Sequence, residues 1–212
     1  MEKKPLVITT YRDRLTHLNC FILYINKYYP ELDIAVSEQF DNGPWNKGML
    51  FNAAVKEYGD DYSYFILHDV DFIPVQGKVD YSHCEVPTMI AGEASQFDYR
   101  LYYPEFFGGV VVLSKEHYYL VNGFSNQFKG YGGEDDLFYR SFKEKGIIPG
   151  VKNGRFECFT HPRPKREDHY RHNVQLLNAG RNYEEGLSTV QYKVVSNGNF
   201  KECKHLKIDT TN

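Results

Sequence analysis

Two clusters of acidic residues have the types and spacing that metal and proton chemistry require. In the first, Asp69 and Asp71 flank one valine, directly after the apolar run 64–67. Alternate residues of a strand point to the same side, so both carboxylates could reach one hard divalent cation and its phosphate ligands. Two solvated acids at the end of a strand are the competing explanation. The apolar strand in front of them favours the metal site.

The second cluster is the run Gly132-Gly133-Glu134-Asp135-Asp136. Acids at a helix N-terminus stabilise the helix by about 0.3 to 1 kcal/mol each, which explains such residues without any function. That explanation does not account for three acids in a row beside two glycines, which let the backbone approach a ligand closely. We interpret the cluster as a helix start that also carries chemistry.

A metal site begun by Asp71 could be completed by His161, because a neutral imidazole is a ligand for several divalent metals. A lone histidine is more often a surface residue. Cys158, three residues earlier, could be a soft further ligand or a buried apolar side chain, and the second interpretation is favoured. The residues alone leave both questions open.

The segments around these residues alternate between strand and helix patterns. Apolar, β-branched runs predict strands over 6–10 and 33–37, and apolar residues at helical spacing predict helices over 15–25 and 49–58. The βαβα order implies a parallel sheet. The strand 64–67 then ends at the first acids, at the carboxyl edge where ligands bind in open α/β sheets.

The C-terminal half has similar signals separated by longer polar stretches. The expected elements are a strand over 108–113, a helix over 115–121, a glycine-rich loop over 123–133, a helix over 134–145, irregular structure over 161–186 and a hairpin strand over 191–196 that turns at Asn197-Gly198. The helix over 134–145 has acids at its start and basic residues at its end, which suits the helix dipole. No repeat or linker interrupts the chain, so we expect one domain over residues 1–212.

The composition is that of an ordinary globular domain with an excess of aromatic rings. Hydrophobic residues make up 42% and charged residues 25%, and a net charge of −3 provides no field that would hold nucleic acid. We therefore expect no nucleic-acid partner. There are 18 Tyr and 15 Phe against one Trp. Core packing accounts for most of them, and some could line a sugar or nucleotide site.

The chain has no recognisable export or membrane signal. The first ten residues contain too short an apolar run for a signal peptide, and no stretch approaches the roughly eighteen apolar residues of a membrane span. The four cysteines are far apart in the sequence and include no C-x-x-C pair: Cys20, Cys84, Cys158 and Cys203. We interpret them as reduced thiols and expect a cytoplasmic protein without a transmembrane segment.

Taken in order, these motifs resemble the β-1,4-galactosyltransferase family over about residues 10–195. The segments that carry the resemblance are Tyr11-Arg12-Asp13-Arg14, Trp45-Asn46-Lys47, His68-Asp69-Val70-Asp71-Phe72-Ile73-Pro74, Phe106-Phe107-Gly108-Gly109, Asn122-Gly123-Phe124, Gly132-Gly133-Glu134-Asp135-Asp136, His161 and Gly186-Leu187-Ser188. The resemblance implies an α/β fold of the GT-A-type nucleotide-diphospho-sugar transferases, with a central, mostly parallel sheet flanked by helices. It also implies an inverting transfer of galactose from UDP-galactose to a carbohydrate acceptor.

The same resemblance implies roles for individual residues. It assigns a metal, normally Mn²⁺ with Mg²⁺ as the alternative, to Asp71 and His161, with Cys158 where the family has a methionine. It makes Asp135 the catalytic base and Glu134 its neighbour in the donor-sugar site. The implied donor-binding residues are Arg12, Arg14, Trp45, Lys47, Asp69, Phe106 and Gly109. The implied acceptor-binding residues are Tyr103, Tyr131, Gly133, Asp136 and Arg171.

Three substitutions distinguish the chain from the family pattern. Lys47 stands where an arginine meets the phosphates, which keeps the charge and loses the bidentate fork. Tyr131 replaces the tryptophan of the closing loop. Phe106 replaces a tyrosine that helps to select galactose, so UDP-N-acetylgalactosamine or another UDP-sugar is the alternative donor. The expected product has a β-1,4 linkage to a GlcNAc- or Glc-like sugar.

Two other classes of protein stay open from the residues alone. An apolar strand that ends in D-x-D also describes an aspartyl phosphatase, in which Asp69 would be the nucleophile. Phosphatase activity on an aryl phosphate, blocked by Asp69→Asn, would separate that class from a transferase. A non-catalytic carbohydrate-binding protein would bind sugar without UDP or metal, and it would leave the pair Glu134 and Asp135 unexplained.

Overall fold

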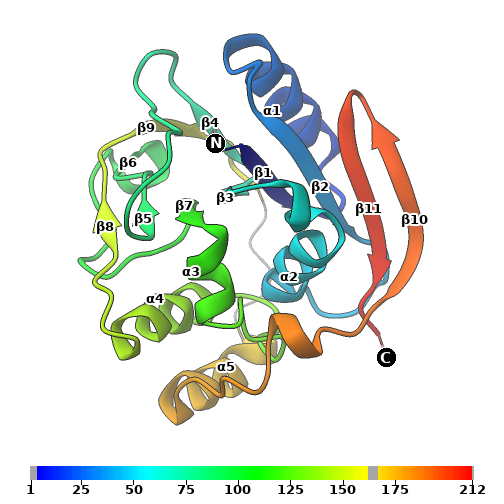
Figure 1. Cartoon of the computed structure of the whole chain (residues 1–212), viewed down its shortest axis with the longest axis vertical. Coiled ribbons are helices and arrows are strands. Elements are labelled where there is room, and N and C mark those ends of the chain that lie inside the picture. Colours follow the sequence, from blue (N-terminus) through cyan, green and yellow to red (C-terminus); the bar gives the residue numbers. More distant parts are fainter. Residues whose placement is uncertain (1–3, 162–166, 212) are drawn as a thin grey trace.

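A computed structural model describes residues 4–161 and 167–211 (Figure 1). An eight-stranded sheet runs through it in the order β10-β11-β2-β1-β3-β7-β5-β8. Its strands are β1 (Pro5–Tyr11), β2 (Asp33–Gln39), β3 (Tyr64–Asp69), β5 (Thr88–Met89), β7 (Val110–Ser114), β8 (Gly150–Val151), β10 (Lys193–Phe200) and β11 (Cys203–Asp209). In Figure 1, β10 and β11 form one edge of the view and β8 lies at the opposite side.

The centre of the sheet is parallel. Strands β11, β2, β1 and β3 run in the same direction, and β1 is buried along nearly its whole length. Such continuous burial is typical of a parallel strand that is covered on both faces. β7 pairs antiparallel with β3 and β5, and β10 pairs antiparallel with β11, so the sheet as a whole is mixed. The α/β class is confirmed, and the parallel arrangement is concentrated in the centre.

Five α-helices flank the sheet within the described residues. They are α1 (Leu15–Tyr28), α2 (Lys47–Tyr58), α3 (Lys115–Leu120), α4 (Glu134–Glu144) and α5 (Glu167–Ala179). α2 packs against β1 and β2, and α5 packs against α4. In Figure 1, α3, α4 and α5 gather at one end of the view. No helix in the described part of the chain is long and apolar enough to cross a membrane.

Three short strands form a second sheet that the hydrophobic pattern does not predict. They are β4 (Phe72–Pro74), β9 (Arg155–Cys158) and β6 (Glu93–Ala94), in the order β4-β9-β6. Phe72 pairs with Cys158, and the N–H of Phe159 donates to the carbonyl of Asp71 at 2.9 Å. The small sheet therefore brings the first acidic cluster next to the segment that carries His161.

The expectation of irregular structure over 161–186 is wrong for the residues that form α5. This helix is polar, and one of the contacts that hold it in place is not visible in the sequence. Asn173 is buried, and its Nδ2 donates to the carbonyls of Lys129 and Gly132, both at 2.9 Å. A buried amide that satisfies several backbone carbonyls ties α5 to the glycine-rich loop, in addition to the packing of α5 against α4.

The position of the expected hairpin turn is also wrong. Asn197 and Gly198 lie within β10 and pair with Leu206 and His205, whereas the chain turns at residues 201–202, where φ is 48° and 65°. Leu206 and Ile208 bury their side chains together with residues of α2. That packing sets the register of β11, and the turn follows from the register rather than from the Asn-Gly pair.

Aromatic rings dominate the core. Most of the largest fully buried side chains are aromatic: Phe21, Phe51, Phe65, Phe72, Phe107, Tyr118, Phe138, Phe142 and Phe156. Phe124 and Phe138 stack with ring centres 4.0 Å apart, which packs the base of α4 onto the loop that follows α3. Core packing thus accounts for much of the aromatic excess.

Candidate active site

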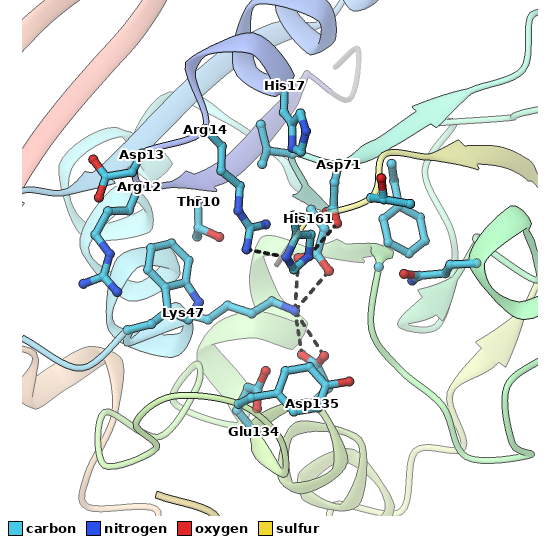
Figure 2. Close-up of a pocket in the computed structure, with 18 of the residues that line it drawn as sticks. Thr10, Arg12, Asp13, Arg14, His17, Lys47, Asp71, Glu134, Asp135 and His161 are labelled. Atoms are coloured by element: carbon cyan, nitrogen blue, oxygen red, sulfur yellow. Dashed lines mark hydrogen bonds and ion pairs between the residues drawn. The ribbon is translucent and has the colours of Figure 1, made fainter. Parts of the chain in front are cut away.

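A cleft of about 730 Å³ opens at the carboxyl ends of the central parallel strands (Figure 2). It is lined by the loop after β1, the end of β3, the first turns of α2 and α4, and the segment around His161. The residues expected in the site that line this cleft are Arg12, Arg14, Trp45, Lys47, Asp69, Asp71, Phe106, Gly109, Tyr131, Glu134, Asp135 and His161. Tertiary structure therefore brings most of the candidates into one place.

Lys47 bridges two carboxylates across the cleft. Its Nζ lies 3.1 Å from Oδ1 of Asp69 at the end of β3. The same Nζ lies 3.1 Å from Oδ2 of Asp135 in the first turn of α4, as Figure 2 shows. Asn46 positions this lysine at the start of α2, because its side chain caps the helix by accepting a hydrogen bond from the N–H of Met49. The exposed fraction is 13% for the Lys47 side chain and 19% for Asp135, so the pair is mostly shielded from water.

The charges around Lys47 change the proton affinity of the cluster. Burial raises the pKa of Asp135 to about 8, and the charges of Glu134 and Asp69 act in the same direction against that of Lys47. Burial also raises the pKa of Glu134. For Lys47, burial acts to lower the pKa, but the surrounding carboxylates outweigh it and hold the pKa well above its usual value. Asp135 can thus take up a proton near neutral pH, which suits a general base.

Two adjacent glycines let Asp135 and the ring of Phe72 lie against the backbone. A Cβ on Gly108 would stand 2.5 Å from Oδ2 of Asp135. Gly109 has a φ of +74°, and a Cβ there would stand 2.7 Å from the ring of Phe72. Any larger residue would displace the carboxylate or the ring, so the close approach explains the glycine pair.

Asp71 and His161 form the second charged group of the cleft. His161 Nε2 lies 3.3 Å from Oδ2 of Asp71, which is 6% exposed. Burial acts to raise the pKa of Asp71, but the hydrogen bond of His161 and the charge of Arg14 hold it below its ordinary value. β3 ends at Asp69 and Asp71 lies in the turn before β4, so strand alternation does not bring the two acids to one cation. Asp69 forms an ion pair with Lys47 instead.

The expected third metal ligand, Cys158 on β9, lies within electrostatic range of Asp71 but outside the lining of the cleft. Burial raises the pKa of its thiol, which disfavours the thiolate that binds metals. Among the residues that the structure describes, no group of three or more His, Cys, Asp or Glu side chains is arranged to hold a metal ion. A carboxylate oxygen and an imidazole nitrogen still suit Mn²⁺ by type, whereas Mg²⁺ prefers oxygen ligands alone.

Arg12 and Trp45 form a platform on another part of the cleft. The guanidinium carbon of Arg12 lies 5.6 Å from the centre of the Trp45 ring, and Nη1 donates to the carbonyl of Gly43 at 2.7 Å. The carbonyl of Trp45 accepts the N–H of Gly130 at 2.7 Å, which ties the glycine-rich loop to this platform. A flat ring with a fixed cation beside it can receive an aromatic base and its phosphates.

Several expected acceptor residues lie outside the main cleft. Tyr103 donates to Asp136 at 2.6 Å, and both line a neighbouring hollow of about 550 Å³ rather than the cleft itself. Gly133 precedes the first turn of α4 with a φ of +93°. Arg171 is exposed on α5 and lines neither hollow. Of the acceptor set, only Tyr131 lines the main cleft.

The structure adds residues that sequence reasoning does not single out. His17, on the first turn of α1, lines the cleft and stacks on Phe159 with ring centres 4.9 Å apart. Thr10, Gln96, Phe97, Tyr102 and Thr160 also line it. The three-residue spacing of Arg14 and His17 on a helix is the one signal that could have connected His17 to the site.

Two family models match the chain in succession. Residues 1–85 match the N-terminal region of glycosyl transferase group 7, and residues 89–169 match a model described as the N-terminal domain of galactosyltransferase. β-1,4-Galactosyltransferase 7 of Mus musculus is 32% identical over 203 residues, which cover 90% of this chain and 61% of that protein. β-1,4-Galactosyltransferase 6 of Homo sapiens is 33% identical over 207 residues, 90% of this chain and 52% of that protein.

The chain thus spans about half to three fifths of the length of these relatives. Among solved structures, the catalytic domain of Drosophila β1,4-galactosyltransferase 7 in complex with xylobiose has a TM-score of 0.86 and 25% identity, over 100% of this chain and 95% of that one. A mutant of that enzyme in complex with manganese, UDP-Gal and xylobiose has a TM-score of 0.85 and 23% identity. The family models, the relatives and the GT-A-type fold agree, and the chain belongs to the β-1,4-galactosyltransferase family.

Proposed function

We propose that this chain transfers galactose from UDP-galactose to a hydroxyl group of a carbohydrate acceptor, with inversion at the anomeric carbon and with a divalent metal. One observation carries the proposal. A single cleft holds a buried carboxylate of raised pKa, Asp135, opposite a second acidic group, Asp71 with His161. The first group suits removal of a proton from the acceptor, and the second suits a metal at the leaving diphosphate.

Asp135 is the residue proposed as the base. It lies at the N-terminus of α4 and touches Lys47, so its carboxylate is held in one orientation. Positioned general bases contribute about 10² to 10⁴ in rate. Attack of the activated hydroxyl from the side opposite the diphosphate inverts the anomeric carbon, which converts an α-linked donor into a β-glycoside. Glu134 lines the same cleft and is proposed as a contact of the donor sugar.

Asp71 and His161 are the residues proposed to hold the metal, Mn²⁺ in the first place and Mg²⁺ as the alternative. A divalent cation, when bound, supplies Lewis-acid stabilisation of the negative charge that develops on the diphosphate. Arg12, Trp45 and Lys47 would receive the base and phosphates of UDP, because they combine an aromatic face with cations on one side of the cleft. The Drosophila relative that was solved with manganese and UDP-Gal has the same fold, which supports a nucleotide and metal site in this cleft.

The choice of donor sugar depends on Phe106. This ring lines the cleft and packs between Phe97 and Tyr103, with ring centres 5.3 and 5.4 Å away. It offers a bulky apolar wall without a hydroxyl. UDP-galactose is the donor that we favour, and UDP-N-acetylgalactosamine is the alternative, because an N-acetyl group needs more room beside this wall.

The acceptor is proposed to be a sugar with a free equatorial hydroxyl, GlcNAc- or Glc-like for a β-1,4 linkage. The Drosophila relative was solved in complex with xylobiose, so xylose-ended acceptors belong in the same test. Tyr131 is half exposed in the glycine-rich loop, where a ring could cover the acceptor sugar. Tyr103 and Asp136 lie in the adjoining hollow and would contact an acceptor longer than one sugar.

The test is UDP release from UDP-galactose, UDP-N-acetylgalactosamine, UDP-glucose, UDP-N-acetylglucosamine and UDP-xylose. Each donor is measured with and without a panel of GlcNAc, glucose, xylose and xylobiose, in Mn²⁺ or Mg²⁺. The expected result is acceptor-stimulated release from UDP-galactose that needs metal and is lost in Asp135→Asn. Release from UDP-N-acetylgalactosamine instead would change the donor and keep the class. Sugar binding that needs neither UDP nor metal, with no release from any donor, would favour a carbohydrate-binding protein. Hydrolysis of an aryl phosphate that Asp69→Asn blocks would favour a phosphatase.

A cytoplasmic location is also part of this proposal. All four cysteines are free thiols, and Cys84 and Cys203 are buried. Free thiols persist in reducing compartments such as the cytoplasm, so the four free thiols support a cytoplasmic location. Titration of the thiols in the native host's protein, after trapping them at lysis, tests it. Four trapped thiols are expected, and a disulfide would contradict the location.

A further inference from the structure

Arg14 makes a contact with His161 that bears on metal binding. Its Nη2 lies 3.0 Å from Nδ1 of His161, and His161 in turn lies against Asp71 (Figure 2). The three side chains come from separate parts of the chain: the N-cap of α1, the turn after β3 and the segment after β9. A single guanidinium therefore holds one of the two proposed metal ligands.

The chemistry of this contact determines which imidazole nitrogen carries the proton. A guanidinium has only donors, so Nδ1 of His161 must accept with its lone pair. A neutral imidazole has one lone pair, and its hydrogen is then on Nε2, where it points to Asp71 Oδ2 at 3.3 Å. A metal ion needs a lone pair from the imidazole, and a metal-bound histidine usually donates its other N–H to an acceptor. Arg14 cannot be that acceptor.

The arrangement with Arg14 on His161 and the arrangement with a metal on His161 therefore exclude each other. If the metal takes Nδ1, it replaces the guanidinium directly. If it takes Nε2, the proton moves to Nδ1 and faces the N–H groups of Arg14. The positive charge of the guanidinium also opposes a divalent cation at this short distance.

We infer that Arg14 is a protein-borne cation that competes with the divalent metal for His161, so that metal binding releases Arg14 into the cleft. The released guanidinium lines the same cleft as Lys47 and Arg12, where it can meet a diphosphate. Metal and nucleotide would then favour each other's binding through one side chain. This inference rests on the metal pair of the proposed function.

His17 explains how Arg14 can leave without loss of the ligand geometry. Its ring stacks on Phe159 at an interplanar angle of 21°, and the N–H of Phe159 is fixed to the carbonyl of Asp71 at 2.9 Å. His17 and Arg14 stand one helical turn apart, so α1 contacts the segment at two points. The contact of Arg14 is with a proposed metal ligand, whereas the stack of His17 is with Phe159 and keeps the segment in place.

The decisive measurement is Mn²⁺ affinity of the full chain without nucleotide, from the electron paramagnetic resonance signal of the free ion. Arg14→Met is expected to bind Mn²⁺ about tenfold more tightly than the wild type, because the competing charged hydrogen bond is gone. Arg14→Lys keeps a cation and is expected to bind no more tightly than the wild type. Weaker or unchanged affinity in Arg14→Met would overturn the inference.

Arg12→Met is the matched control, because it removes the same charge from the same loop. Figure 2 shows Arg12 pointing away from His161, and its guanidinium donates to the carbonyl of Gly43. Its Mn²⁺ affinity without nucleotide should stay within about twofold of the wild type. Equal tightening in both variants would mean a general charge effect and would also overturn the inference. Thermal unfolding without metal shows whether each variant folds.

Asp71→Asn separates this inference from the metal assignment. Loss of Mn²⁺ binding in Asp71→Asn, with unchanged binding in Arg14→Met, would keep the metal pair and reject the competition. Unchanged binding in Asp71→Asn would reject the metal pair and the competition together. In ¹⁵N spectra of the metal-free wild type, Nδ1 of His161 is expected at the shift of an unprotonated nitrogen, and Arg14→Met should remove that preference.

Discussion

Lys47 and Asp135 form an ion pair inside the cleft, with Nζ of the lysine 3.1 Å from Oδ2 of the aspartate. The same ammonium lies 3.1 Å from Asp69 Oδ1. One cation therefore pairs with a carboxylate at the end of β3 and with another at the start of α4. Removing one partner of such a shielded pair leaves an uncompensated charge. The proton affinity of the proposed base therefore depends on a residue 88 positions away in the sequence.

Asp135→Asn is expected to lower the rate of transfer by at least about 10²-fold, because the amide cannot accept the acceptor's proton. UDP binding in the presence of Mn²⁺ should be retained, since Asp71 and the platform of Arg12 and Trp45 are unchanged. Calorimetric UDP affinity beside the initial rate of UDP release checks both parts. Asp61→Asn, an exposed acid outside the cleft, is the control and should match the wild type. Undiminished transfer in Asp135→Asn would remove this residue from the mechanism.

The rate should rise with pH. A general base acts in its ionised form, and Asp135 has its pKa raised to about 8 by burial, so kcat/KM is expected to increase about tenfold per pH unit between 6 and 7 and to level off above 8. Replacement of Lys47 by Met removes the charge that lowers this pKa, and the inflection should move to higher pH. Initial rates between pH 5.5 and 9.5 test both curves. A flat wild-type profile would contradict the assignment of Asp135 as base.

His68 should make the protein less stable in mild acid. It is fully buried, its Nδ1 donates to the carbonyl of Asp69 at 2.9 Å, and its Nε2 accepts from the hydroxyl of Tyr81 at 2.9 Å. Burial lowers its pKa to about 4 from 6.5. The unfolded chain therefore binds more protons between these values, and the free energy of unfolding falls as pH decreases from 6.5 to 4, by about 3 kcal/mol in total at 1.36 kcal/mol per unit.

Urea unfolding of the wild type and His68→Gln at several pH values isolates this contribution. The variant is expected to be less stable at pH 7 and to lose less stability on acidification, because glutamine does not titrate. The carboxylates titrate equally in both proteins, so the difference between the two curves reports the imidazole of His68. Parallel curves for the two proteins would show that His68 contributes nothing to the acid dependence.

Asn173 should control the order of the glycine-rich loop. Its Nδ2 donates to Lys129, Gly132 and Tyr131 carbonyls at 2.9, 2.9 and 3.4 Å. Asn173→Ala is expected to lower the free energy of unfolding by about 1 to 3 kcal/mol, because buried carbonyls lose their donor. Hydrogen exchange of the loop amides should accelerate, and the KM for the acceptor should rise more than kcat falls. Asn178→Ala, exposed on the same helix, is the control and should change neither.

Local patterns determined much of this protein. The apolar runs before Asp69 and the helical spacing of Leu18, Phe21, Ile22 and Ile25 predicted strands and helices that the structure confirms. Their order predicted a parallel centre for the sheet, and the acids at the end of β3 predicted the edge at which the cleft opens. These features depend on side chains close together in sequence, whose spacing fixes which face they bury.

Tertiary structure decided which of the candidates act together. The two acids of the D-x-D motif have different partners, because β3 ends at Asp69. Asp69 forms an ion pair with Lys47, whereas Asp71 contacts His161. The small sheet that brings the segment of His161 to Asp71 has strands too short to show a pattern, and α5 joins the glycine-rich loop through the buried side chain of Asn173. Contacts between distant segments arise from packing and burial, and no local spacing encodes them. The pKa values of the site residues depend on these contacts between distant segments, so they arise only in the folded chain.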